Sequence, residues 1–576
     1  MPKSITRRHA LLGTSAVLAG CVINTRTGGA DAGSDARSDA GGPLDAASGT
    51  PDGSATAGLD AAHALEWAPG PFVLVATLPM AIDLSPTLPA GTPGGGTFAV
   101  DASGQVLPSG VTLSAAGKLS GEAATPGASA EVVFAYTAGS TTLLSKPTRV
   151  FVQEAPRFAD GTEAGTFAAD VWTPGRNAQG VVNQVSWDLV PKGRWVTVAG
   201  TRLDALDAEV KAAIPGWNDY GSSRWGGVAH AWNGVAIDEQ GCRAWWICAG
   251  GHADSSNNGI YRFDAYKMAY AIEHLPSDTN QWSERYRKLQ DSGTFTYCGE
   301  SDREFQGSND AGSAPMKDGW FYDELFWDRQ PTSRHVYSGV LFLASSNELI
   351  MAVRRLWRYS LTTGQWTSKR IAGDNPRNNL GEENIVEYDQ STNRLLTLAC
   401  GSGGPWGDTF DLDTDSWLGQ PPPGTGWDLS GGADNRHGNT VTIFRGPEAP
   451  EMYASPGRYL SYDVVTRQVL ASGNVQLEGF ALTDFPKGQD GTGMVYIPVL
   501  DRYWVAMRTK AGEVGWYELD PTTTPWTFRA LAPQAGIVPA LDGGSTLIRR
   551  RMVWMPSMSA VVFLGSASKD ISLYRF

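Results

Sequence analysis

The sequence lacks any long run in which apolar residues recur at helical spacing, and this absence argues against a helical bundle. Positive charge is also in short supply, because 46 Lys and Arg face 60 Asp and Glu for a net charge of −14. This balance argues against nucleic acid as the main partner. The apolar stretch near the N-terminus, residues 10–19, is too short to cross a bilayer as a permanent helix.

Cysteine is scarce, with 5 residues in the whole chain, and the Cys-x-x-Cys spacing of a structural zinc site does not occur. Besides Cys21 there are Cys242, Cys248, Cys298 and Cys400, an even number that permits disulfides in an exported protein, in any of three connectivities. Cys242 and Cys248 lie on one expected strand, about 20 Å apart if it is straight, which is too far to bridge each other. We predict no metal and no cofactor.

The first 21 residues are predicted to be an export and lipoprotein signal that is not part of the fold. The run Thr-Arg-Arg-His-Ala-Leu at residues 6–11 resembles a twin-arginine export signal, and the run Leu-Ala-Gly-Cys that ends at Cys21 resembles a bacterial lipobox. The resemblance implies that Cys21 is lipidated and becomes the mature N-terminus. Val22 follows it, which favours the outer membrane. We therefore expect a bacterial cell-envelope protein held by its lipid alone, with a secreted protein as the alternative.

Two further segments precede the main domain. Residues 22–64 are mostly Asp, Gly, Ala and Ser, which bury too little surface to fold, so they are predicted to form a disordered tether. In residues 65–154, the run Leu-Pro-Ser-Gly at 107–110 is followed by Gly-Lys-Leu-Ser-Gly at 117–121. This pair of turns resembles the immunoglobulin-like modules of bacterial surface proteins. The resemblance implies a small β-sandwich that acts as a spacer.

The remaining residues, 155–576, carry an internal repeat. The whole chain has 68 Gly, 34 Pro and 10% aromatic residues, which favours short strands and frequent turns. Each unit has an apolar strand anchored by a valine, a turn, a second strand, and a third that often ends in aromatic-x-Asp before a closing Trp. Four short strands per unit resemble a kelch-type β-propeller. The anchor valines are Val235, Val340, Val386, Val441, Val495 and Val553.

The spacing of the anchors bears on the number of blades. Val235 and Val340 are about twice as far apart as later neighbours, so a degenerate blade is expected between residues 273 and 327. We predict an all-β chain with a seven-bladed propeller; six blades with a long insertion is the alternative. The chain ends on a third strand, so residues 185–187 or 195–199 are expected to supply the missing outer strand and remove an open sheet edge.

Two histidines occupy equivalent positions in the repeat. His-Ala-Trp-Asn-Gly-Val begins at His230 and His-Val-Tyr-Ser-Gly-Val begins at His335, in a chain with 7 histidines. Loops that lead into first strands of a propeller open on one face, so the residues before the anchors are expected to gather at one mouth of the channel. Imidazoles and guanidiniums gathered there suit an anionic substrate and proton transfer. The expected set is Ala229, His230, Arg334, His335, Tyr337, residues 382–384, Asn435, Arg436, His437, Gln489, Asp490 and residues 549–551, together with His252 from the Gly-Gly-His loop at 250–254.

A histidine before an early first strand, with Gly-Gly-His about twenty residues later, resembles the propeller polysaccharide lyases, ulvan lyases in particular. The resemblance implies acid and base roles for His230, His252 and a downstream tyrosine, matched in approximate position by Tyr297. We expect a monomer that cleaves a uronic-acid-containing anionic polysaccharide by β-elimination, with Arg303 or His335 neutralising the substrate carboxylate. The expected substrate-binding residues are Arg303, Arg334, His335, Tyr337, Arg436 and His437.

Two other functions remain open from the sequence. A propeller of this kind can bind glycan or protein without catalysis, because loops on propellers often only bind. A copper radical oxidase of the galactose-oxidase type is also kelch-based, and Cys242 and Cys248 lie in the same expected blade as His252. That enzyme would need a Tyr-His pair, and no Tyr-His dipeptide occurs here.

Replacing Cys21 tests the predicted lipid anchor. The variant Cys21→Ala is expected to leave the membrane fraction or to remain unprocessed, because the acyl chains would be the only attachment to the bilayer. Fractionation of expressing cells measures this. A membrane-bound fraction equal to that of the wild type would contradict the prediction.

Overall fold

The computed structural model describes Trp67 and most of residues 72–576. The longer stretches outside the description are 77–80, 282–325, 370–383, 400–407, 420–431, 450–455, 487–491 and 540–548, and shorter gaps include His252 and Ala253. The predicted signal with Cys21, the predicted tether, Tyr297 and Arg303 therefore lie outside the described residues.

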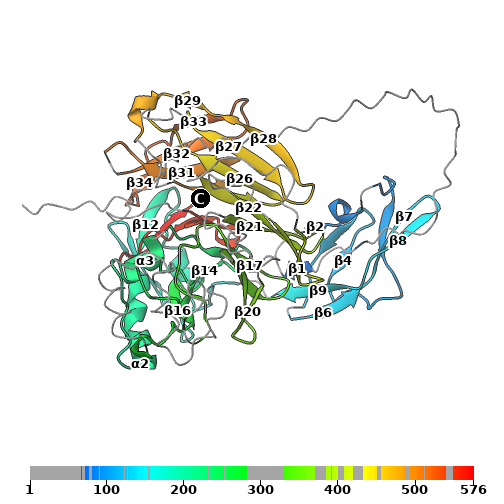
Figure 1. Ribbon diagram of the computed structural model, residues 1–576, viewed down its shortest axis with the longest axis horizontal. Helices are drawn as coiled ribbons and strands as arrows, with labels where there is room; N and C mark the ends of the chain where they lie inside the picture. Colours follow the sequence, from blue (N-terminus) through cyan, green and yellow to red (C-terminus); the bar gives the residue numbers. More distant parts are fainter. Residues whose placement is uncertain are drawn as a thin grey trace, which may run out of the picture. The chain divides into compact units, whose positions relative to one another are not determined.

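The chain is all-β, with a small β-sandwich ahead of a β-propeller (Figure 1). The sandwich has three small sheets, ordered β1-β9-β6, β2-β5-β4 and β3-β7-β8, around a core that includes Trp67, Phe72 and Phe134. Its strands are β1 (Phe72–Val75), β2 (Ala81–Asp83), β3 (Thr97–Val100), β4 (Thr112–Leu113), β5 (Lys118–Ser120), β6 (Ser129–Val132), β7 (Phe134–Ala138), β8 (Thr141–Leu144) and β9 (Thr148–Gln153).

The two turns that suggested this module depend on glycine. Gly110 and Gly117 have φ of 80° and 82°, in the left-handed region that side chains disfavour. A Cβ on Gly117 would also lie 2.7 Å from the Phe98 ring, which is part of the buried core. The Leu-Pro-x-Gly and Gly-x-Leu-x-Gly pattern therefore reflects turn geometry.

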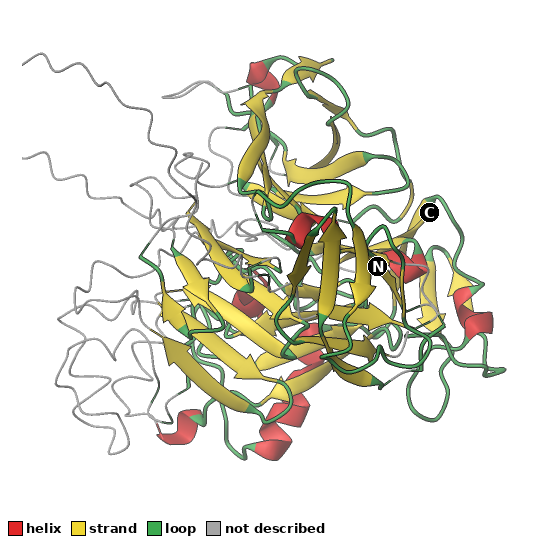
Figure 2. Ribbon diagram, turned by 90° about the vertical axis from the view of Figure 1, so that its right-hand side faces the viewer, coloured by secondary structure: helices red, strands yellow, loops and turns green. Residues whose placement is uncertain are grey.

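The propeller contains six sheets in the part of the chain that is described, four of them four-stranded and two with additional strands, and strands dominate the regular structure (Figure 2). Five are continuous in sequence. They are β13–β16 (Ala236–Asp238, Arg243–Ile247, Ile260–Asp264, Ala269–His274); β17–β20 (Val340–Leu343, Glu348–Val353, Arg355–Ser360, Gln365–Lys369); β21–β24 (Asn384–Asp389, Arg394–Ala399, Thr409–Asp411, Ser416–Trp417); β25–β28 (Ala433–His437, Thr440–Arg445, Arg458–Asp463, Gln468–Asn474); and β30–β33 (Gly493–Ile497, Arg502–Arg508, Val514–Asp520, Thr527–Ala530), with β29 (Gln476–Glu478) added beside β33.

The sixth sheet closes the ring. It joins β35 (Met552–Met555), β36 (Ala560–Phe563) and β37 (Ser572–Arg575) to β12 (Arg194–Val198), and Trp195 lies opposite Tyr574 (Figure 1). The same sheet continues through β11 (Val171–Pro174) and β10 (Gly165–Ala168), and β34 (Ala535–Gly536) also pairs with β12. Of the two segments proposed for this closing strand, 195–199 is confirmed. Residues 185–187 instead belong to the short helix α1 (Gln184–Trp187), so that alternative is wrong.

The repeated aromatic-x-Asp motif has a structural cause. Oδ1 of Asp264, Asp411, Asp463 and Asp520 accepts a backbone N–H two residues later, which shapes the turn after these four third strands. The closing Trp packs across the turn: Tyr359 lies opposite Trp366, and Phe410 opposite Trp417.

Direct pairing between the first two blades bears on the blade count. The segments leading into β13 and β17 form a parallel bridge between Asn233 and Tyr337, and Gly234 donates its N–H to the Tyr337 carbonyl at 2.8 Å. The inner edges of the blades that begin with β13 and β17 are therefore adjacent at the channel. This pairing fits the six-bladed alternative, with residues 282–325 of the expected extra blade outside the described part.

One blade was misassigned from the sequence. The anchor Val441 lies in β26, the second strand of its blade, and the first strand is β25. Arg436 and His437 therefore stand at the end of a first strand, beside the turn into the second. The physical reason is that β25, Ala-Asp-Asn-Arg-His, is polar after its first residue, whereas first strands such as β17, β30 and β35 are mostly apolar.

This polar strand takes part in a buried ion network in the channel. Arg550 donates from Nε to Asp434 at 2.6 Å, from Nη2 to Glu387 at 2.6 Å, and from Nη1 to the Val340 carbonyl at 3.0 Å. Ser338 donates to the other oxygen of Asp434. Asp434 and Glu387 raise the pKa of the Arg550 guanidinium although burial opposes this. The network joins the sheets of β17, β21, β25 and β35.

The helices are short. In the described part they include α1, α2 (Asp207–Ala213) and α3 (Trp225–His230), with 3-10 turns η1 (Ser85–Thr87), η2 (Leu203–Leu206), η3 (Thr279–Gln281), η8 (Leu482–Asp484) and η9 (Pro556–Met558). None of the helices in the described residues combines the length and apolar character needed to cross a membrane.

Removing Arg550 tests whether the channel network stabilises the fold. Arg550→Met should lower the free energy of unfolding by about 3–5 kcal/mol, because it leaves two buried carboxylates without their cation. Chemical denaturation measures the shift. The control is Arg202→Met, which removes an exposed guanidinium paired with Asp204 and should change little. Equal denaturation midpoints for the two variants would contradict this role.

Candidate functional site

One mouth of the channel brings a histidine, a carboxylate and two aromatic rings together. His335 Nε2 lies 3.1 Å from Asp254 Oδ2. The Trp232 ring lies 4.6 Å from the His335 ring, centroid to centroid, and the Tyr337 ring lies 6.1 Å from it. His335 is 8% exposed. The imidazole is thus held by a carboxylate on one side and by aromatic faces on others, which is an arrangement suited to proton transfer beside a sugar ring.

A buried asparagine ties the histidine-bearing segments together. Asn233 is fully buried and donates from Nδ2 to the carbonyls of Gly227 and Val228, near the end of α3 that carries His230. The same amide group donates to the Ala249 carbonyl in the approach to the Gly-Gly-His loop. Its Oδ1 accepts the N–H of Val336, the neighbour of His335, at 2.9 Å. The segments that lead to His230, His252 and His335 therefore share one side chain.

The mouth contains strained backbone. Trp232 and Tyr337 have φ of 53° and 47°, in a region that aromatic residues rarely adopt. Arg550, which enters the channel network, has φ of 46°. Such conformations cost of order 1–3 kcal/mol each and gather at functional sites. The equivalence of His230 and His335 in the sequence thus reflects two aromatic residues in the same unusual conformation.

The loop that carries Asp254 rests on a buried polar network. Asp219 Oδ1 accepts from Ser255 Oγ at 2.8 Å and from the Ser256 N–H at 3.1 Å. Burial raises the pKa of Asp219 to about 7, against the opposing effect of these hydrogen bonds. Gly250 permits the close approach of the loop, since a Cβ there would lie 2.5 Å from the Ser255 carbonyl oxygen.

Two arginines belong to the same mouth and differ in their contacts. Arg334 is buried and folds back onto Thr332, donating to its carbonyl and to its hydroxyl. Arg549 is fully buried, and its guanidinium carbon lies 4.9 Å from the centroid of the Tyr337 ring. Arg334, His335 and Tyr337 thus lie on the segment that leads into β17, and Arg549 contacts Tyr337.

Arg436 and His437, predicted to lie at this mouth, are at the opposite end of the channel. First strands run parallel from blade to blade, as the bridges Asn233–Tyr337 and Ser338–Ile385 indicate, so the start and the end of a first strand point to opposite mouths. Arg436 bonds Glu387 at 2.9 Å and the Tyr388 carbonyl at 3.0 Å. The placement of both residues was wrong, because the polar strand β25 was not recognised as the first of its blade.

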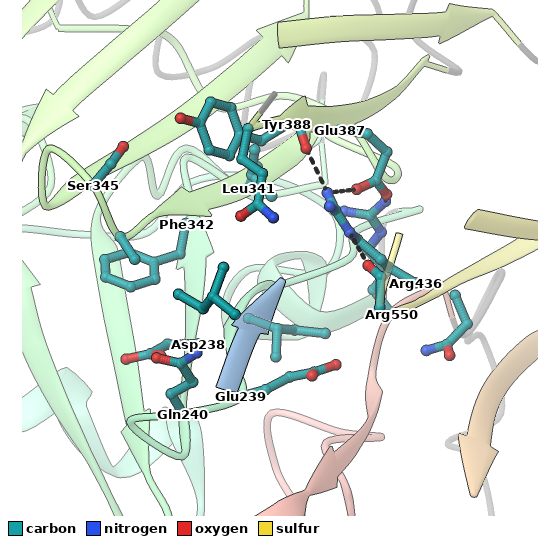
Figure 3. Close-up of a pocket in the computed structure, with 16 residues that line it drawn as sticks. Asp238, Glu239, Gln240, Leu341, Phe342, Ser345, Glu387, Tyr388, Arg436 and Arg550 are labelled. Carbon is teal, nitrogen blue, oxygen red and sulfur yellow. Dashed lines mark hydrogen bonds and ion pairs between the residues drawn. The ribbon is translucent and has the colours of Figure 1, made fainter. Parts of the chain in front are cut away.

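The opposite mouth has a pocket in which Glu387, Arg436 and Arg550 form an ion network (Figure 3). The close-up shows Arg436 and Arg550 both reaching Glu387, with Phe342 and Asp238 across from them. Each oxygen of Glu387 is bound by a different arginine, at 2.9 and 2.6 Å. Asp238 binds Arg243 at 2.6 Å. The chemistry here is mainly that of an internal ion network.

Three of the residues proposed for catalysis or binding, His252, Tyr297 and Arg303, lie outside the described residues. Sequence reasoning missed Asp254 as the partner of His335, and it missed the structural use of Asn233. A signal for Asn233 was present, because it stands inside the repeated His-x-aromatic-x-Gly-Val motif. Asp254 stood in the Gly-Gly-His loop that was already selected.

Comparisons with known proteins place this fold only loosely. No family model matches the chain, and no curated protein matches it. A GH43_1 enzyme from Xanthomonas citri, complexed with xylotriose, has 11% identity over 41% of this chain and 85% of that chain, with a TM-score of 0.23. A GH43 β-1,3-galactosidase has 10% identity over 53% and 95%, with a TM-score of 0.28. A DUF4784 family protein from Bacteroides caccae has 9% identity over 81% and 84%, with a TM-score of 0.22. Scores this low say nothing of what this chain binds.

The raised pKa of Asp219 predicts a pH dependence of stability. Between about pH 4 and 7 the folded protein keeps this proton while the unfolded chain has released it, because the pKa of Asp219 rises from 3.8 to about 7 on folding. The contribution of Asp219 to the free energy of unfolding therefore falls as pH rises through this window, by at most about 1.4 kcal/mol per pH unit.

Asp219→Asn should remove that slope and leave the protein more stable than the wild type near pH 8. Urea unfolding at several pH values measures the difference between the two proteins. Asp188→Asn, at an exposed helix end, is the control. A difference between the wild type and Asp219→Asn that is constant with pH would contradict the assignment.

Proposed function

We propose that the protein is a carbohydrate-active propeller that cleaves a uronic-acid-containing anionic polysaccharide by β-elimination, at the mouth lined by His335, Asp254 and Trp232. The observation that carries the proposal is the His335–Asp254 pair at 3.1 Å, set against the Trp232 ring. An aromatic face packs well on a sugar ring, and an imidazole titrates in the range that proton transfer requires.

The reaction has two proton transfers. A base removes the proton at C5 of the uronate, the C–H electrons form the C4–C5 double bond, and the C4–O bond breaks as its oxygen takes a proton from an acid. Nε2 of His335 lies within hydrogen-bond distance of Asp254, and a carboxylate so placed orients an imidazole and stabilises the positive charge that the ring gains when it takes the C5 proton. This pairing supports His335 as the base, a role beyond the substrate binding first expected of it.

His230 is the described candidate for the acid. It ends α3, whose last carbonyls are held by Asn233, and Asn233 also binds the backbone next to His335. His252 and Tyr297 keep the acid and base roles that the family resemblance implies, and Arg303 keeps that of a substrate-binding cation; all three remain proposals. The lipid anchor at Cys21 and the cell-envelope location are proposals of the same standing.

A second candidate is glycan binding without cleavage. It is favoured by the limited exposure of His335, which leaves 8% of the residue in contact with solvent. In this candidate the imidazole, covered by Trp232 and Asp254, shapes an aromatic binding surface and transfers no proton. The two candidates differ in whether an unsaturated product forms.

Substitution of the two histidines separates these candidates. His335→Ala and His230→Ala should each lower turnover by about 10²-fold or more, the usual scale for a lost general base or acid. Turnover is measured as ultraviolet-absorbing unsaturated product from uronate-containing polysaccharides.

His274→Ala is the matched control. His274 ends the fourth strand of the same blade as His230, with Nδ1 2.7 Å from the Leu275 carbonyl oxygen, so its loss should leave turnover unchanged. If no uronate-containing polysaccharide yields product but one binds, the non-catalytic candidate holds. Full activity of both folded histidine variants would overturn the assignment of the catalytic residues.

A further inference from the structure

Arg549 is a buried cation without an acceptor. Its residue is fully buried, and no described group accepts a hydrogen bond from its Nε, Nη1 or Nη2. The next two residues are different. Arg550 binds Asp434 and Glu387, and Arg551 donates from Nη1 to the carbonyls of Ala229 and Gly565. Of the three consecutive arginines at the channel, Arg549 is the one whose guanidinium has no hydrogen-bond acceptor or ion-pair partner among the described residues.

Burying a guanidinium without a partner lowers the stability of the folded protein. Arginine has five N–H donors and keeps its charge, and buried charges are normally paired. The Tyr337 ring, 4.9 Å from the guanidinium carbon, gives a cation–π contact, which offsets part of the desolvation but accepts no conventional hydrogen bond. The donors that remain fit a ligand that supplies negative charge and lone pairs.

The position of Arg549 connects it to the proposed site. Tyr337 lies between Arg549 and His335, because its ring contacts the guanidinium of Arg549 and the imidazole of His335. His335 in turn pairs with Asp254. Neither Asp254 nor Asp219, the described carboxylates on the loops of this mouth, pairs with Arg549: Asp254 binds His335, and Asp219 accepts from Ser255 and Ser256. A carboxylate from outside the chain that bound Arg549 would therefore meet an unused cation, separated from His335 by the Tyr337 ring.

We propose that Arg549 binds the carboxylate of a uronate residue at this mouth. The planar fork of a guanidinium matches the two oxygens of a carboxylate, which a point charge such as ammonium does not. The partly exposed Trp232 ring is an aromatic side chain of the kind that packs on a sugar. The identity of the sugar rests on the proposed function, whereas the anion site rests on Arg549 itself.

Binding of D-glucuronate to the full chain tests the site, with acetate and D-glucose as parallel probes at constant ionic strength. Glucuronate should raise the unfolding temperature of the wild type in a concentration-dependent manner, because a ligand that binds only the folded state stabilises it. Glucose should have a much smaller effect. A response to acetate as large as that to glucuronate would overturn the uronate assignment, since any carboxylate would then suffice.

Arg549→Met is the decisive variant. Without ligand it should unfold at or above the wild-type temperature, since it removes an unpaired buried charge, and it should lose the response to glucuronate. Arg202→Met, which removes an exposed arginine, should keep the full response. Arg549→Lys retains the charge without the fork and should bind glucuronate about tenfold more weakly or worse. If Arg549→Met does not fold, an undiminished response of Arg549→Lys overturns the proposal, as does an undiminished response of Arg549→Met.

The same proteins distinguish this inference from the proposed function. If the wild type releases unsaturated product and Arg549→Met does so with an unchanged KM, the Arg549 site is refuted while the lyase stands. If no product forms but glucuronate binding depends on Arg549, the site stands and the lyase is refuted.

Discussion

The guanidinium of Arg550 holds the centre of the propeller. A ring of blades leaves a channel at its axis, and here the channel is occupied by a cation that binds a carboxylate from β21, another from β25, and a carbonyl from β17. Each partner lies on a different sheet, so the ion network sets the positions of the inner strands relative to one another. Buried charges are tolerated there because Ser338 and Arg436 complete the hydrogen bonding of Asp434 and Glu387.

That arrangement explains both the success and the failure of sequence reasoning. Apolar first strands such as β17 and β30, and the aromatic-x-Asp turns, repeat because each blade meets the same packing and turn constraints, so they could be recognised without a structure. The strand β25 could not. It is polar because Asp434 pairs with Arg550 and Arg436 pairs with Glu387. These partners come from distant parts of the chain, so the pairing leaves no pattern in the local sequence. The one-strand shift in that blade moved Arg436 and His437 to the wrong mouth.

The candidate site was predictable in its location but not in its internal connections. The repeat placed His230 and His335 at equivalent positions, and the Asn233–Tyr337 bridge explains why, because the two segments pair with each other. The bond from His335 to Asp254 joins residues 81 positions apart, and the contact of Arg549 with Tyr337 joins residues still farther apart in the sequence. The repeat had suggested only that cations gather near the channel. Which of them is paired internally is a property of the three-dimensional structure.

The two mouths of the channel differ in how completely their charges are satisfied, and this difference indicates the working face. At the opposite mouth, Glu387 binds two arginines and Asp238 binds Arg243, so a ligand would have to compete with internal partners. At the mouth of His335, strained backbone at Trp232 and Tyr337 is retained, and Arg549 is held without an acceptor. The same fold pairs Arg550 completely and leaves Arg549 unpaired, as expected if the donors of Arg549 are kept for a ligand. The unpaired charge of Arg549 and the His335–Asp254 pair are therefore the observations on which the proposed site depends.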